Sequence, residues 1–116
     1  MSALPAPNRA RPVLESFDVL LRGLPGVTSQ RVRVVVSGRV QGVWFRDSCR
    51  EQARVERVGG WVRNRRDGDV EAEFEGNADA VARMVEWCRQ GPPRANVTDV
   101  TTTTLEPIGE QTFRIR

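Results

Sequence analysis

The stretch Gly38–Arg46 most constrains the fold, because it joins two segments of different periodicity. It follows an apolar run, Val32–Val36, that predicts a buried strand, and it precedes a charged, periodic stretch, Asp47–Val58, that predicts a helix. Backbone N–H groups at a helix N-terminus lack intrahelical partners, and the helix dipole is positive there. A glycine-bearing loop in this position is therefore a candidate anion site. It ends in Arg46, whose planar guanidinium suits a phosphoryl group.

The rest of the chain alternates between strand-like and helix-like patterns. Two helices are expected, at Phe45–Val58, ended by a left-handed cap at Gly59-Gly60, and at Asn77–Gln90, with Asn77 as N-cap. Strands are expected at Arg31–Ser37, Gly60–Asn64, Asp69–Gly76, within Asn96–Glu106, and at Phe113–Arg116, with a hairpin turn at Arg65–Gly68. The order β-α-β-β-α-β plus a short C-terminal strand predicts an α+β, ferredoxin-like split βαβ fold, with an antiparallel sheet and two helices on one face.

The predicted strand Asp69–Gly76 alternates between apolar and acidic residues. Val70, Ala72 and Phe74 share one face, and Asp69, Glu71, Glu73 and Glu75 share the other. We expect the acidic side to be a solvated face paired with Arg63 or Arg65. Carboxylates spread along one strand face lie about 6.6–6.8 Å apart per pair, so they do not converge on a metal ion.

Composition excludes several kinds of chemistry. All 18 basic residues are arginine, and the chain contains neither histidine nor tyrosine. A Ser-His-Asp or Cys-His pair, a Schiff-base lysine and a His-ligated metal are therefore excluded. The net charge of +3 does not demand a nucleic-acid partner, and no apolar run is long enough to span a membrane. Cys49 and Cys88 lie far apart, which favours reduced thiols in the cytoplasm over a disulfide between the helices.

The order of several motifs resembles the acylphosphatase family over about residues 31–116. The resemblance rests on the stretch 38–46, then Gly60-Trp61-Val62-Arg63-Asn64, Asp67-Gly68, Val70-Glu71, Gly76, Trp87, Gly91-Pro92, Ala95, Val97 and Phe113-Arg114-Ile115-Arg116. The family usually ends its first helix with a sequence like Leu-Gly-Leu, whereas this chain has Glu56-Arg57-Val58. Residues 31–116 would then form the acylphosphatase-like domain.

This resemblance implies hydrolysis of a small acyl phosphate to a carboxylate and inorganic phosphate, without cofactor or metal. Arg46 would hold the phosphoryl group and Asn64 would hold the attacking water. Trp44 and Phe45 would be packing residues at the loop exit. The phosphate-binding loop would comprise the backbone of Val40, Gln41, Gly42, Val43, Trp44, Phe45 and Arg46. We expect a cytoplasmic monomer with no nucleic-acid or membrane partner.

Several alternatives remain. One is a non-enzymatic anion-binding or regulatory domain on the same fold. Another is an RNA-binding domain, which would need stacking aromatic residues and basic residues on the open sheet face. Cys88 and Arg94 fit the C-x5-R spacing of cysteine phosphatases, but Cys88 is predicted to lie on a helix and Pro92 and Pro93 remove amides that a cradle needs. Residues 1–30 read as an extension, either loose or docked as a short amphipathic helix.

Overall fold

The computed structural model describes residues 29–116, so the expectations for residues 1–28 lie outside the described residues. The elements are β1 (Ser29–Arg39), α2 (Phe45–Glu56), β2 (Gly59–Asn64), β3 (Val70–Asn77), α3 (Ala78–Gln90), β4 (Asn96–Leu105) and β5 (Phe113–Ile115). Each expected element is present, with ends that differ by one or two residues. Neither helix in this range is long and apolar enough to cross a membrane.

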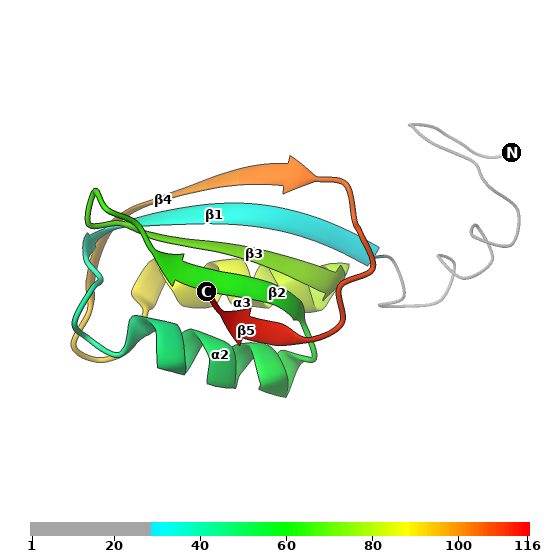
Figure 1. The fold of residues 1–116 in the computed structure, drawn as a ribbon, viewed down its shortest axis with the longest axis horizontal. Coiled ribbons are helices and arrows are strands. Elements are labelled where there is room, and N and C mark those ends of the chain that lie inside the picture. Colours follow the sequence, from blue (N-terminus) through cyan, green and yellow to red (C-terminus); the bar gives the residue numbers. More distant parts are fainter. Residues whose placement is uncertain (1–28) are drawn as a thin grey trace, which may run out of the picture.

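The five strands form one sheet in the order β4-β1-β3-β2-β5, with both helices against one side (Figure 1). This confirms the ferredoxin-like fold. Strands β4, β1, β3 and β2 are antiparallel neighbours, but β5 pairs in parallel with β2, so the expected antiparallel sheet is mixed at one edge. The reason is topological. After β4 the chain passes to the opposite edge of the sheet and reverses, which gives β5 the direction of β2.

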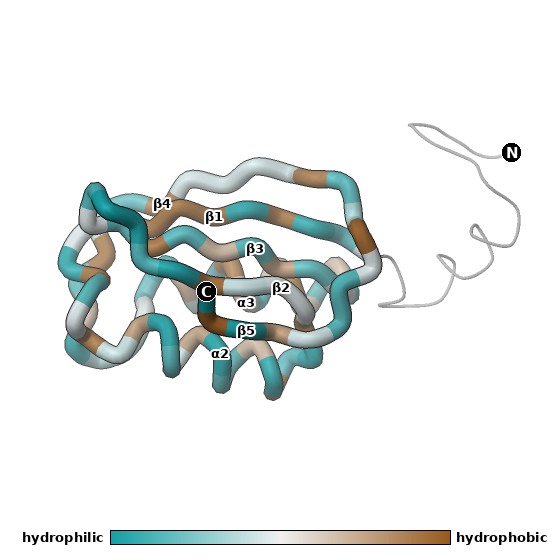
Figure 2. The backbone as a smooth tube through the Cα atoms, viewed as in Figure 1, coloured by the Kyte–Doolittle hydropathy of each residue, from teal (hydrophilic) through white to brown (hydrophobic). Residues whose placement is uncertain are grey.

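The core lies between the sheet and the two helices. Hydrophilic and hydrophobic residues alternate along β1 and β3 (Figure 2), and Val34 and Phe74 on their helix-facing sides are fully buried. The buried residues of α2 are Phe45, Cys49 and Ala53, and those of α3 are Ala80, Val81, Met84 and Cys88. Their helical spacing agrees with the predicted apolar stripes. Burial of these stripes holds both helices on one face of the sheet.

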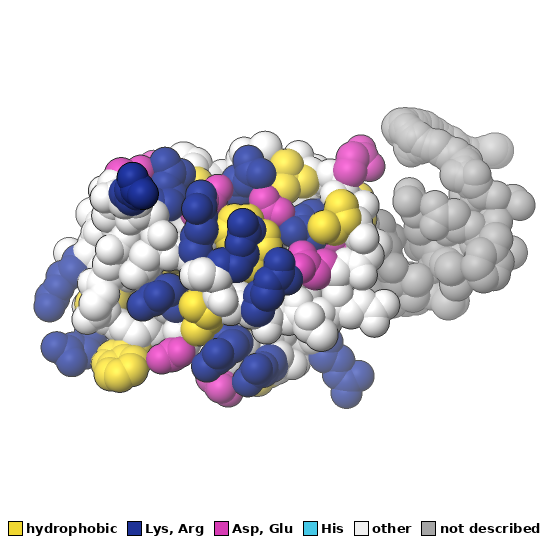
Figure 3. Space-filling model, in the orientation of Figure 1, with side chains coloured by type: hydrophobic (Ala, Val, Ile, Leu, Met, Phe, Trp, Pro, Cys, Tyr) yellow, Lys and Arg dark blue, Asp and Glu magenta, His cyan; other side chains and the backbone are white. Residues whose placement is uncertain are grey.

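The acidic side of β3 is not the solvated face that the alternation predicted. Glu71, Glu73 and Glu75 are buried, with exposures of 8%, 7% and 3%. Strand β3 is the central strand, and arginines from its neighbours β1 and β2 lie over it. Figure 3 shows basic side chains gathered over the middle of the sheet with acidic ones between them. The predicted pairing of Glu71 with Arg63 is confirmed, with nitrogen and oxygen 2.6 Å apart. The three glutamates are nevertheless buried rather than solvated, because the arginines that pair with them cover them.

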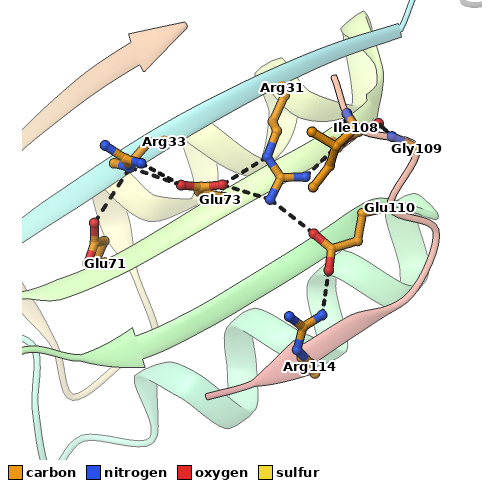
Figure 4. Close-up of polar contacts among 9 residues, drawn as sticks. Arg31, Arg33, Glu71, Glu73, Ile108, Gly109, Glu110 and Arg114 are labelled. Atoms are coloured by element: carbon orange, nitrogen blue, oxygen red, sulfur yellow. Dashed lines mark hydrogen bonds and ion pairs between the residues drawn. The ribbon is translucent and has the colours of Figure 1, made fainter. Parts of the chain in front are cut away.

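Arg31 is the centre of this buried ion-pair network, which Figure 4 shows. Its guanidinium donates to Glu73 at 2.8 Å, to Glu75 at 2.7 Å and to Glu110 at 3.0 Å. Glu75 also accepts hydrogen bonds from the amides of Ile108 and Gly109. The network therefore ties the connection between β4 and β5 to the centre of the sheet.

Helix α2 ends differently from the prediction. Arg57, not a glycine, is the left-handed residue at the C-cap, with φ of 60° and ψ of 46°. Its amide donates to the carbonyl of Arg54. Arg57 stands where the acylphosphatase family usually has glycine, and a residue with a Cβ pays about 1–2 kcal/mol in this conformation. The predicted cap at Gly59-Gly60 is wrong because Gly59 already begins β2.

We expect Arg57→Gly to stabilise the protein by about 0.5–1 kcal/mol. Glycine removes the left-handed strain, and its greater freedom in the unfolded chain offsets part of the gain. Urea unfolding measures the difference in the free energy of unfolding between the variant and the wild type. The matched control is Arg54→Gly, in the last turn of the same helix, which should destabilise by about 1 kcal/mol. Equal loss of stability in both variants would contradict the strain at Arg57.

Candidate active site

Three connections meet at one end of the sheet: β1 to α2, β2 to β3, and α3 to β4 (Figure 1). A cavity of about 510 Å³ lies at this end. It is lined by Val40, Gly42, Trp44, Phe45, Arg46, Asp47, Asn64, Arg94 and Ile115. The cavity therefore brings together Arg46 and Asn64, which are far apart in the sequence but were both predicted from it as site residues.

Two glycines shape the loop that lines this cavity. A Cβ on Gly38 would lie 2.2 Å from the carbonyl oxygen of Asn96, so only glycine allows β4 to approach there. Gly42 is left-handed, with φ of 73°, and a Cβ there would meet no described atom within 4 Å. Gly38 therefore serves packing, whereas Gly42 serves the turn of the loop beside open space.

The amides of this loop are available to a ligand. Among residues 29–116, no hydrogen bond joins the backbone N–H groups of residues 41–44 to another residue. The first turn of α2 adds N–H groups with no intrahelical acceptor. Its N-cap residue, Trp44, gives no side-chain cap, in contrast to Asn77, whose side chain accepts from Asp79 at the start of α3. These N–H groups therefore have no described partner and lie at the positive end of a helix.

Arg46 and Asn64 face the cavity with unused hydrogen-bonding capacity. Arg46 is exposed and makes no ion pair with a described residue. Asn64 ends β2, and its Oδ1 atom is buried without a hydrogen-bond partner among the described residues. A buried acceptor is normally paired, and leaving one unpaired costs about 1–3 kcal/mol. This oxygen is therefore an acceptor that no described residue uses.

The remaining loop residues hold the loop in place. Gln41 donates from Nε2 to the carbonyls of Arg65 at 2.7 Å and Asp69 at 3.0 Å. Its side chain thus joins the loop to the hairpin that follows Asn64, a role that the sequence did not signal. Val43 is buried in the core and does not line the cavity.

The two aromatic residues at the loop exit behave differently from each other. Phe45 packs as predicted: it is 2% exposed and makes an edge contact with Trp87, with ring centroids 5.3 Å apart. Trp44 is 66% exposed and left-handed, so the prediction that it is a packing residue is wrong. Trp44 instead lines the cavity.

Arg94 and Ile115 also line the cavity and were not predicted as site residues. Arg94 follows two prolines after α3, and in the sequence it stands out only as the end of the C-x5-R pattern. That pattern fails in the structure, because Cys88 lies within α3 and is fully buried. Cys49 and Cys88 are both free thiols, and burial together with the Cys88 neighbour raises the pKa of the Cys49 thiol. Neither cysteine is placed to attack a ligand in the cavity.

The fold and this cavity define a ferredoxin-like domain with a basic pocket at a helix N-terminus. A sequence model of the family described as Acylphosphatase matches residues 32–115. The chain therefore belongs to the acylphosphatase family, as the motifs implied. Its activity is the hydrolysis of acyl phosphates to a carboxylate and inorganic phosphate.

Individual relatives agree with this assignment. An acylphosphatase of Haloquadratum walsbyi is 52% identical over 89 residues, covering 77% of this chain and 96% of the relative. One from Rubrobacter xylanophilus is 62% identical over 72 residues, covering 62% of this chain and 66% of the relative. The crystal structure of acylphosphatase from Bacillus subtilis superposes with a TM-score of 0.72 at 39% identity, covering 75% of this chain and 98% of that one.

Proposed function

We propose that the loop amides and Arg46 bind the phosphoryl group of the substrate, and that Asn64 positions the attacking water. The observation that carries this proposal is that one cavity is lined by Asn64, whose buried Oδ1 atom has no partner among the described residues, and by Arg46, which makes no ion pair with them. The loop amides are those of residues 40–46.

The charge distribution of the cavity fits a phosphoryl dianion. Free N–H groups at the start of α2 and the guanidinium of Arg46 supply donors to its oxygens. The same donors stabilise the charge that develops in the transition state, without reorganisation. Asp47 also lines the cavity, but its carboxylate pairs with Arg50 at 3.4 Å, on the next turn of the helix. The net charge at the loop is therefore favourable for an anion.

Asn64 supplies an acceptor rather than a base. Its amide oxygen accepts a hydrogen bond from water and holds that water for in-line attack on phosphorus, without the repulsion that a carboxylate would bring. The P–O bond to the acyl oxygen breaks, and its electron pair leaves on the carboxylate. The water proton passes to a phosphate oxygen of the substrate. No covalent intermediate on the enzyme is required.

We further propose that the enzyme acts as a monomer in the cytoplasm, without nucleic-acid or membrane partners. Two buried free thiols are in keeping with a reducing compartment. An RNA-binding sheet face needs exposed aromatic rings. Trp61, on the helix-free face, is only 7% exposed and lies 4.2 Å from the guanidinium of Arg116. Its ring is therefore already covered.

The test of this function is hydrolysis of benzoyl phosphate by the full chain in EDTA, compared with Cys88→Ser. We expect turnover that EDTA leaves unchanged, inhibition by inorganic phosphate, and activity of Cys88→Ser within about twofold per folded molecule. The physical reason is that protein groups alone form the proposed site. Phosphate binding without turnover would favour the non-enzymatic alternative. Abolition of activity in Cys88→Ser would overturn the assigned roles.

A further inference from the structure

The cavity contains a second guanidinium that the proposed chemistry does not use. Arg94 is exposed, lines the cavity together with Arg46, and makes no ion pair or hydrogen bond with a described residue. Many other arginines of residues 29–116 are paired with carboxylates, including Arg31, Arg33 and Arg63. An unpaired cation in a substrate cavity is available for a ligand anion.

Arg94 is held on a rigid turn beside the phosphate-binding loop. The amide of Ala95 donates to the carbonyl of Pro92 at 3.0 Å, which places Pro93 and Arg94 at the centre of the turn. Gly91, the residue before this turn, packs against the first residue of α2, since a Cβ on Gly91 would lie 2.8 Å from the Phe45 ring. This packing places Arg94 beside the N-terminus of α2, where it lines the same cavity as Arg46.

The cavity has room for more than a phosphoryl group. Its volume of about 510 Å³ lies within the range of pockets that hold a small organic molecule, about 300–1,000 Å³. Trp44, Phe45 and Ile115 supply apolar lining. If Arg46 and the loop amides take the phosphoryl group, the acyl group occupies the remaining space, where Arg94 is the other cation.

We propose that Arg94 forms a second anion subsite that binds a carboxylate on the acyl group of the substrate. The enzyme then prefers acyl phosphates whose acyl part is itself negatively charged. This inference rests on the proposed function, because it assumes that the phosphoryl group sits at the loop. Arg94 is a specificity-determining residue in this scheme, and it takes no part in the transfer of the phosphoryl group.

The test compares two substrates of matched length, 3-carboxypropanoyl phosphate and the neutral butanoyl phosphate. For the wild type we expect kcat/KM to be about tenfold higher with the carboxylate, the scale of one charge-assisted hydrogen bond. Arg94→Gln should remove this preference, mostly through KM, and should leave butanoyl phosphate within about twofold. Added salt should weaken the preference of the wild type. The matched control is Arg66→Gln, an exposed arginine outside the cavity lining, which should keep the preference.

Two results would overturn the inference. One is a wild type that does not distinguish the two substrates. The other is an Arg94→Gln variant whose kcat falls equally for both, which would place Arg94 in the phosphoryl-binding machinery. Failure of the proposed function looks different, because Arg46→Ala and Asn64→Ala would then keep the wild-type activity on benzoyl phosphate, whatever Arg94→Gln does to the preference. Thermal unfolding of each variant checks that it is folded.

Discussion

Asn64→Ala is expected to lower kcat for benzoyl phosphate by at least about 100-fold, the scale of losing one preorganised donor or acceptor at a transition state. The substitution removes the only contact that we assign to the attacking water, and it removes none of the phosphate ligands. Inhibition by inorganic phosphate should therefore stay within about twofold of the wild type. Steady-state kinetics with phosphate as a competitive inhibitor separates the two effects.

Arg46→Ala should lower both kcat and the affinity for inorganic phosphate. We expect a similar loss in kcat of at least about 100-fold, together with weaker inhibition by phosphate, because Arg46 is assigned to both ground-state and transition-state binding. The matched controls are Asn96→Ala and Arg66→Ala, exposed residues that do not line the cavity, and both should retain activity. A phosphate affinity lost in Asn64→Ala but kept in Arg46→Ala would reverse the assigned roles.

The fold of Asn64→Ala offers an independent check. Oδ1 of Asn64 is buried and has no described partner, so alanine removes an unpaired acceptor rather than a stabilising hydrogen bond. The variant should be at least as resistant to urea as the wild type. A large loss of stability would show that Asn64 is structural, and the loss of kcat would then need another explanation.

Arg31→Met is expected to have the largest effect on stability, about 3–5 kcal/mol. Arg31 is 3% exposed and bonds to three glutamates, of which Glu73 and Glu75 are themselves buried. Methionine retains some packing but leaves buried carboxylates short of a partner. Urea unfolding measures the loss in the free energy of unfolding relative to the wild type. The control Arg83→Met breaks an exposed pair with Glu56 and should cost less than about 1 kcal/mol.

The same network should make the protein sensitive to acid. Burial alone would raise the pKa of Glu75, but hydrogen bonds from the Ile108 amide, the Arg31 guanidinium and the Gly109 amide outweigh it, and the pKa is lowered. Stabilisation by Glu75 is therefore complete above its unfolded pKa of about 4.5 and is lost as pH falls through the lower folded value. Glu75→Gln should reduce the change in the free energy of unfolding between pH 3 and pH 7, measured by urea unfolding. An unchanged pH dependence in this variant would contradict the role of Glu75.

Patterns along the chain were enough to predict the elements and the main site residues. The change from strand to helix periodicity located the loop 40–46, and Asn77 was correctly read as a helix cap. The family motifs pointed to Arg46 and Asn64, and the structure places both on one cavity. These features are local or belong to motifs of fixed order, so they can be predicted from the sequence alone.

Other features depended on neighbours distant in the sequence. The acidic face of β3 looked solvated because alternation does not reveal that β3 is central and that arginines from β1 and β2 cover it. Arg57 adopts the left-handed C-cap conformation because α2 ends before Gly59, which pairs in β2. Trp44 was read as a packing residue, yet its backbone conformation turns it to solvent. Arg94 lines the cavity because the segment 91–95 packs beside α2, a contact that no local pattern reveals.

The sequence by itself determined which segments are strands and helices, which loop joins a strand to a helix N-terminus, and which chemistry is open to a chain without histidine or lysine. Periodicity and residue chemistry act over a few neighbouring positions, so they can be read along the chain. Only the tertiary structure decided which charges are buried in pairs and which remain free to meet a substrate. Burial and pairing depend on strand order and on the packing of distant turns, and these follow from the whole fold.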